Sequence, residues 1–129
     1  MSGAVDVELL RFIRGEIDPR GFPHSEHVRM GFEMLRRHNF AEACAHYSAA
    51  LRVMTARIGK PEAFHQTMTI AFLAFIAERL EEGGQTDFAA FAAANPDLMT
   101  KSALARWYSP ERLATEAARV TFLLPDRRG

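Results

Sequence analysis

Apolar residues recur at helical spacing along most of this 129-residue chain, and no segment alternates polar and apolar residues over the length of a strand. The most regular pattern lies between Phe40 and Ile58, where apolar side chains follow the 3.6-residue period of an α-helix for about five turns. Its members are Phe40, Ala43, Cys44, Tyr47, Leu51, Met54 and Ile58. The sequence therefore predicts an all-α fold.

Glycine, proline and asparagine residues divide the rest of the chain into further helices. The expected helices span about 7–13, 23–38, 40–58, 62–82, 87–94 and 110–122, with a short additional helix over 98–107. Thr86 and Ser109 are the expected caps of the two helices that follow them. We expect residues 1–129 to form a single helical domain, a bundle of about five to six helices around the long helix 62–82, which is apolar on nearly every side.

Composition excludes several classes of protein. The 16 basic residues are balanced by 16 acidic ones, and no basic face stands out, so nucleic acid is not an expected partner. The single cysteine, Cys44, rules out an internal disulfide, and residues 1–6 lack the pattern of a signal peptide. The longest apolar run, 70–77, is far shorter than the ~20 residues that span a bilayer. We expect a cytoplasmic protein without a membrane partner.

Three histidines are the strongest indication of a functional site. His24 and His27 are three residues apart at the start of the second helix, which places their side chains on one helical face. His65 lies near the start of the long helix. Short connections make successive helices antiparallel neighbours, so the second helix and the long helix run parallel and all three histidines fall at the same end of the bundle.

A group of three imidazoles suits a divalent metal ion such as zinc or iron, and leaves one position open for water or substrate. Thr69, one turn after His65, is positioned to orient a ring or a bound water, and Glu26 and Tyr47 are weaker supporting candidates. A haem or organic cofactor held by His27 or His65 is a weaker alternative. The plain structural alternative is an exposed His24 and a core His65 bonded to a carbonyl.

Tyr108 and Arg119 have two interpretations. Together with Asp126 they fit an ion pair and a cap near the end of the last helix, and Arg119 also fits a donor to an anionic ligand. The structural interpretation is favoured, because cations at the end of a helix normally satisfy its carbonyl groups. Cys44 is expected to be a buried, inert thiol.

Several short motifs together resemble those of a family of small, uncharacterised helical bacterial proteins. The motifs are Phe22-x-His24-x-x-His27-Val28-Arg29, His65-x-Thr67-x-Thr69, and Tyr108-Ser109 followed by Leu113, Ala118-Arg119, Phe122 and Pro125-Asp126. The resemblance covers about residues 22–126 and implies that these motifs surround one pocket. It brings no established activity, and this chain has Phe64 where the pattern has a tyrosine.

The leading hypothesis is a histidine-lined pocket that binds a metal, a cofactor or a small-molecule ligand and supports redox or hydrolytic chemistry. His24, His27 and His65 are its candidate metal ligands or acid–base groups, and Thr69, Tyr108 and Arg119 are further candidates for positioning the ligand. Whether the protein is an enzyme stays open. The alternative is a non-catalytic interaction module that forms a homodimer through Phe88, Phe91 and the alanine-rich segment 89–94.

Overall fold

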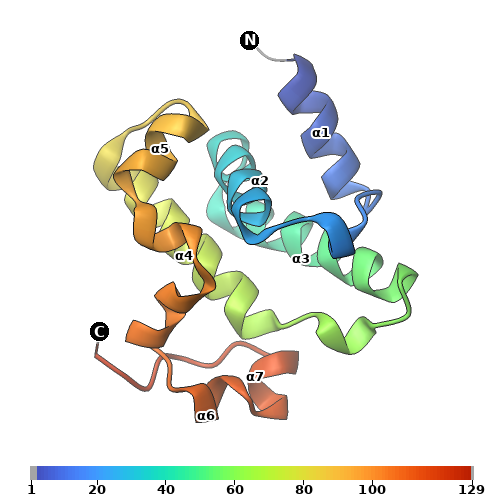
Figure 1. The fold of residues 1–129 in the computed structure, drawn as a ribbon, viewed down its shortest axis with the longest axis vertical. Coiled ribbons are helices and arrows are strands. Elements are labelled where there is room, and N and C mark those ends of the chain that lie inside the picture. The colour runs from blue at the N-terminus through green and yellow to red at the C-terminus, as the bar shows by residue number, and fades with distance from the viewer. Residues whose placement is uncertain (1–2, 129) are drawn as a thin grey trace.

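The computed structural model describes residues 3–128, which form α-helices and 3-10 helices and contain no strand (Figure 1). The α-helices are α1 (Gly3–Ile13), α2 (His24–Arg37), α3 (Phe40–Arg57), α4 (Gln66–Gly83), α5 (Phe88–Ala94), α6 (Pro110–Leu113) and α7 (Glu116–Val120). The 3-10 helices are η1 (Pro19–Gly21), η2 (Pro61–Ala63), η3 (Pro96–Met99) and η4 (Lys101–Arg106). The predicted all-α bundle is confirmed.

Helix α4 is the centre of the bundle. It runs diagonally through Figure 1, from α5 at one end to α6 and α7 at the other, and packs against α2, α3, α7, η3 and η4. Its side chains also enter each of the three buried apolar clusters: Leu73 joins the first, Ile76 the second and Ala71 the third. Burial on several sides explains why its sequence is apolar nearly all round.

The three clusters divide the core between different groups of helices. The first contains Leu9, Phe12, Met30, Met34, Ala43, Tyr47, Ala50, Met54 and Leu73. The second contains Val28, Phe32, Ile76, Phe91 and Leu98, and the third contains Ala71, Leu104 and Tyr108. The core is therefore three adjoining clusters along α4 rather than one uniform layer.

Several helix ends follow the sequence closely. The side chains of Asn39 and Ser109 cap α3 and α6 by accepting hydrogen bonds from backbone N–H groups in the first turn. Helix α4 ends at Gly84, which has a left-handed backbone conformation with φ of 67°. These ends depend on residues only a few positions apart.

Other elements differ from their predicted bounds. The long helix begins at Gln66 rather than at 62, because Pro61 starts a separate 3-10 turn and Phe64 is extended. The last helix is divided, since Thr115 caps a new helix only two residues after Leu113. The segment 98–107 forms parts of two 3-10 helices, and Asp87 rather than Thr86 caps α5.

The apolar face proposed for a homodimer is partly used inside the protein. Phe91 is fully buried, and its ring centroid lies 5.0 Å from that of Phe32. Phe88 packs on the same cluster, with its ring 5.6 Å from Phe32. The assignment of Phe91 to an exposed interface was therefore wrong, because Phe32 of α2 covers it. Phe88 is half-buried and most of segment 89–94 is exposed, so the homodimer stays a prediction.

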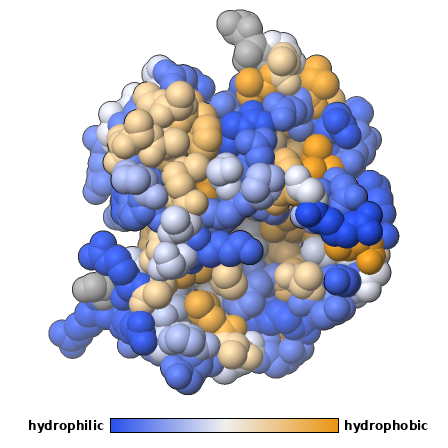
Figure 2. Space-filling view, in the orientation of Figure 1, coloured by the Kyte–Doolittle hydropathy of each residue, from blue (hydrophilic) through white to orange (hydrophobic). Residues whose placement is uncertain are grey.

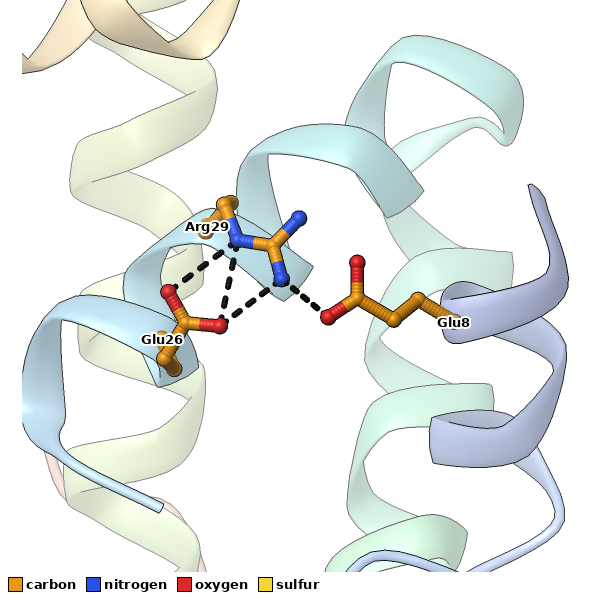
Figure 3. A network of polar contacts seen from close by, with 3 residues as sticks. All are labelled: Glu8, Glu26 and Arg29. Carbon is orange, nitrogen blue, oxygen red and sulfur yellow. Dashed lines mark hydrogen bonds and ion pairs between the residues drawn. The ribbon is translucent and has the colours of Figure 1, made fainter. Parts of the chain in front are cut away.

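An ion-pair network joins the first two helices (Figure 3). The guanidinium of Arg29 on α2 lies between two carboxylates and donates to Glu8 Oε2 on α1 at 2.5 Å and to Glu26 Oε1 at 2.7 Å. These hydrogen bonds hold the pKa of Glu26 below its usual value. Glu26 thus serves the contact between α1 and α2 and does not support the histidines.

No helix within residues 3–128 is both long and apolar enough to cross a membrane.

Candidate functional site

A cavity of about 290 Å³ lies between the first and second apolar clusters, beside Met68 and Phe72, which pack against the third. Tyr47 and Leu73 of the first cluster and Val28 and Ile76 of the second form part of its wall. The complete lining is Pro19, His24, His27, Val28, Tyr47, Leu51, Thr55, Ala63, Phe64, His65, Met68, Thr69, Phe72, Leu73, Ile76 and Lys101. The first and second clusters adjoin here without filling the space between them.

The same region is hollowed at the molecular surface. Figure 2 shows a recess near the middle of this face, with hydrophobic colour inside it and mainly hydrophilic residues around it. In Figure 1 the amino end of α2, with α3 and α4 behind and below it, occupies the same part of the view. All three histidines line the cavity, so the sequence correctly placed them at one end of the bundle.

His24 is the first residue of α2 and is half-buried. Its Nε2 lies 3.1 Å from the carbonyl oxygen of Leu98, and its ring meets the edge of Phe72 at a centroid distance of 4.9 Å. Burial lowers the pKa of His24, and the positive charge of Lys101 lowers it further, while the Leu98 carbonyl acts in the opposite sense. The ring is therefore neutral near pH 7 and is anchored to η3.

His27 is one turn further along α2, between two aromatic rings. Its ring centroid lies 4.9 Å from that of Phe22, and the hydroxyl of Tyr47 lies 3.4 Å from Nδ1 while donating to the backbone oxygen of His27 at 2.7 Å. Burial lowers the pKa of His27 to about 4, with smaller contributions from the charges of His24 and Lys101. His27 is thus a neutral ring in an apolar wall.

His65 has a structural role that its sequence position concealed. It is the N-cap of α4 rather than a residue inside the helix, and Nδ1 accepts a hydrogen bond from Met68 N–H at 3.1 Å. Because Nδ1 accepts, Nε2 carries the hydrogen and donates to the Leu113 oxygen at 2.8 Å. Both ring nitrogens are engaged by the backbone, which is the plain structural alternative given above.

The arrangement of His65 bears directly on the expected metal site. A ligand nitrogen needs a free lone pair, and His65 has none to offer in this geometry. Within residues 3–128 no group of three or more His, Cys, Asp or Glu side chains is arranged to hold a metal ion. A metal bound by His24, His27 and His65 gains no support from this geometry and stays a prediction.

The other candidate residues separate into two groups. Thr69 lines the cavity, but its hydroxyl donates to the backbone oxygen of His65 at 2.7 Å. Tyr108 is buried in the third cluster and donates to Leu123 O at 2.7 Å, and neither it nor Arg119 belongs to the cavity wall. The structure does not bring these two residues to the histidines.

Arg119 and Asp126 serve surface contacts instead. Arg119 forms an ion pair with Glu116 one turn before it, at 2.5 Å from Nη2 to Oε2. Asp126 accepts hydrogen bonds from the backbone N–H and the hydroxyl of Ser109, at 2.8 and 2.6 Å. The structural interpretation of Arg119 agrees with this geometry, although its partner is Glu116 rather than Asp126.

Lys101 is the residue that sequence reasoning missed. It begins η4, is exposed, and lies in the cavity wall close enough for its charge to act on both His24 and His27. Nothing in the local sequence marks it, because its place at the cavity depends on the path of the chain after α5. Its position was available only from the tertiary structure.

A scan against models of protein families found no match to this chain, and searches of curated proteins and of solved structures found none either. The family resemblance of the histidine and Tyr-Ser motifs therefore stays a prediction.

Proposed function

We propose that this protein binds a small, mostly apolar organic molecule in the histidine-lined cavity. Ligand sites are typically concave, lined mainly by apolar side chains, and supplied with a few polar groups that orient the ligand. The cavity has this character, because most of its wall is aliphatic or aromatic and its polar members include His24, His27 and Lys101. Its volume of about 290 Å³ favours a compact molecule, since sites for drug-sized ligands occupy ~300–1,000 Å³.

Binding is favoured over hydrolytic chemistry by the groups in the wall. Among the described residues around the cavity there is no serine, cysteine, aspartate or glutamate. The two threonine hydroxyls each donate to a carbonyl of the preceding turn: Thr55 to Leu51 at 2.9 Å and Thr69 to His65 at 2.7 Å. The cavity wall thus lacks an activated serine, cysteine or threonine nucleophile, and it lacks a carboxylate that could orient a histidine as a base.

A titration with 1-octanol, followed by methyl NMR, tests this proposal. We expect the methyl signals of Leu73 and Ile76, which line the cavity, to shift in a saturable way. The methyl signals of Leu9 and Leu98 are internal controls, because these residues are buried in the clusters but do not line the cavity. Shifts that fail to saturate, or that spread equally over all four residues, would contradict a specific site.

Two variants locate the binding further. Ala63→Trp places a large side chain in the cavity wall, and Ala56→Trp places the same side chain on an exposed position of α3 outside it. We expect octanol affinity to fall in the first variant and to stay unchanged in the second. Equal affinities in both variants would argue that octanol binds elsewhere.

A homodimer is a second candidate, favoured by exposed apolar side chains outside the segment first considered. Val7 and Leu10 are exposed on α1, as are Val120, Phe122 and Leu124 at the end of α7 and just after it. Figure 1 places α1 and α7 at opposite ends of the molecule, so these side chains form two separate sets, and each is a candidate contact surface between two copies. Light scattering decides the matter, because a concentration-independent monomer mass would exclude a stable dimer.

A further inference from the structure

The cavity wall carries positive charge without negative charge. The chain as a whole has equal numbers of acidic and basic residues, yet among the described residues around the cavity the ionisable ones are histidines, Tyr47 and Lys101. Three acids, Asp18, Glu26 and Glu62, stand next to a lining residue in the sequence. Glu62 is exposed and its charge acts on Arg119, and the other two are paired with arginines. Asp18 is paired with Arg20 at 2.9 Å, and Glu26 is paired with Arg29 at 2.7 Å.

Lys101 is the charged member of this wall. No ion pair to Lys101 occurs within residues 3–128, so its ammonium group is not neutralised by a carboxylate there. It lies close enough to His24 and His27 to oppose the protonation of both rings. An anion beside Lys101 would give this ammonium group the opposite charge that the described residues do not supply.

The amino end of α2 adds to the same local charge. Helix α2 has 14 residues, starts at His24 and has Pro23 as its N-cap, and Pro23 offers no side-chain acceptor to the N–H groups of the first turn. The first turn of α2 contributes both His24 and His27 to the cavity wall. The positive end of the helix dipole is therefore on the same side of the cavity as Lys101.

Another part of the wall is apolar, and Phe72 in it touches the His24 ring. Leu51 of α3 and Met68, Phe72, Leu73 and Ile76 of α4 offer no charge and no free hydrogen-bond donor. A molecule that satisfies both parts needs a negative group at one end and a compact hydrocarbon body at the other.

We infer that the ligand of this cavity is a carboxylic acid with a compact apolar body, whose carboxylate binds beside Lys101, His24 and His27 while the body lies against α3 and α4. This inference rests on the proposed function, because it names the class of molecule that the same cavity takes. Lys101 supplies the ion pair and determines the preference for an anion over a neutral molecule of the same shape.

Octanoate and 1-octanol are a matched pair of probes, since they share the chain length and differ in the charged end. We expect isothermal titration at pH 7 and low salt to show octanoate binding about tenfold more tightly than octanol. In Lys101→Gln the octanoate affinity should fall about tenfold, to the level of octanol, and the octanol affinity should stay unchanged. Lys101 is exposed, so this substitution leaves the core intact.

Lys60→Gln is the matched control, because Lys60 is the other lysine of the chain, is exposed, and does not line the cavity. It should bind both probes as the wild-type protein does. If octanoate and octanol bind equally, or if Lys101→Gln and Lys60→Gln weaken octanoate to the same extent, the anion inference is overturned while the apolar site stands. If neither probe binds, the proposed function itself fails.

Discussion

Individual side chains in this protein have structural roles that their position in the sequence does not reveal, and His65 is the clearest example. The ring joins the start of α4 to the end of α6 by accepting from Met68 and donating to Leu113. A cap of this kind contributes ~1 kcal/mol, and a hydrogen bond to a carbonyl contributes a similar amount. His65, which the sequence indicated as a metal ligand, is therefore better explained as a structural link between α4 and α6.

Substitution of His65 tests this role. We expect His65→Ala to lower the free energy of unfolding by about 2 kcal/mol, and His65→Asn to recover about half of the loss because asparagine also caps helices well. Urea denaturation measures both. His46→Ala is the control, since His46 is exposed on α3, and it should change stability by less than about 0.5 kcal/mol. Equal small losses in all three variants would contradict the capping role.

His27 makes the stability of the protein depend on pH. Its pKa is about 4 in the folded protein and 6.5 in the free side chain, so the unfolded chain binds more protons between these values. The stability that His27 contributes is therefore fully present above pH 6.5 and is lost as pH decreases toward 4. The contribution of His27 is at most about 1.4 kcal/mol per pH unit in this window, or about 3 kcal/mol in total.

A comparison with His27→Leu isolates this contribution. Carboxylates and His24 titrate in both proteins, so the difference between the two pH profiles belongs to His27. We expect urea denaturation between pH 7 and pH 4 to show a clearly shallower loss of stability in the variant. Parallel profiles would mean that His27 is solvated rather than buried in the cavity wall.

At the scale of elements, two glycines with the same backbone conformation are under different constraints. Gly15 follows α1 with φ of 69°, and Gly59 follows α3 with φ of 74°. A Cβ atom on Gly15 would lie 2.5 Å from Val53 Cγ1, whereas one on Gly59 would meet nothing within 4 Å. Gly15 thus permits the close approach of α1 to α3 as well as the turn.

The pair of alanine variants separates these two effects. Gly59→Ala should cost about 1–2 kcal/mol, from the left-handed backbone alone. Gly15→Ala should cost about 1–3 kcal/mol more, because the added methyl group overpacks the contact with Val53. The double variant Gly15→Ala/Val53→Ala should recover only part of that excess in denaturant titrations, because the Cβ of residue 53 would still lie 2.7 Å from the new methyl group. An equal cost at the two glycines would show that α1 does not approach α3 this closely.

At the scale of the whole molecule, the metal hypothesis and the apolar-ligand proposal predict different effects of EDTA and of octanoate on the Tm. A molecule that binds only the folded protein stabilises it by ~2.7 kcal/mol at a concentration one hundred times its Kd. We expect saturating octanoate to raise the Tm by roughly 5–10 °C. Because both nitrogens of His65 are already engaged, we expect EDTA to leave the Tm unchanged.

Metal analysis of the same sample completes this test. A stoichiometric metal ion together with a large decrease in Tm after EDTA would restore the three-histidine hypothesis, and would require His65 to leave Leu113 or Met68. His65→Ala is informative here only beside His65→Asn, because loss of the cap lowers the Tm without any metal.

The sequence alone determined the features that depend on neighbouring residues. Helical periodicity and the cap at Ser109 were correctly predicted, whereas Asp87 took the place of Thr86 as the cap of α5. The cap at Asn39 and the left-handed end at Gly84 likewise involve contacts within about one turn. The position of the histidines at one end of the bundle also followed, because short connections make neighbouring helices antiparallel.

Tertiary structure alone decided the rest. The bond from His65 to Leu113 spans 48 positions, the bond from His24 to Leu98 spans 74, and Lys101 reaches the cavity only through the path of the chain after α5. The burial of Phe88 and Phe91 likewise depends on α2. The local sequence pattern determines whether a segment prefers to be a helix. The partner of a given side chain depends instead on which distant segments pack beside it in the folded core.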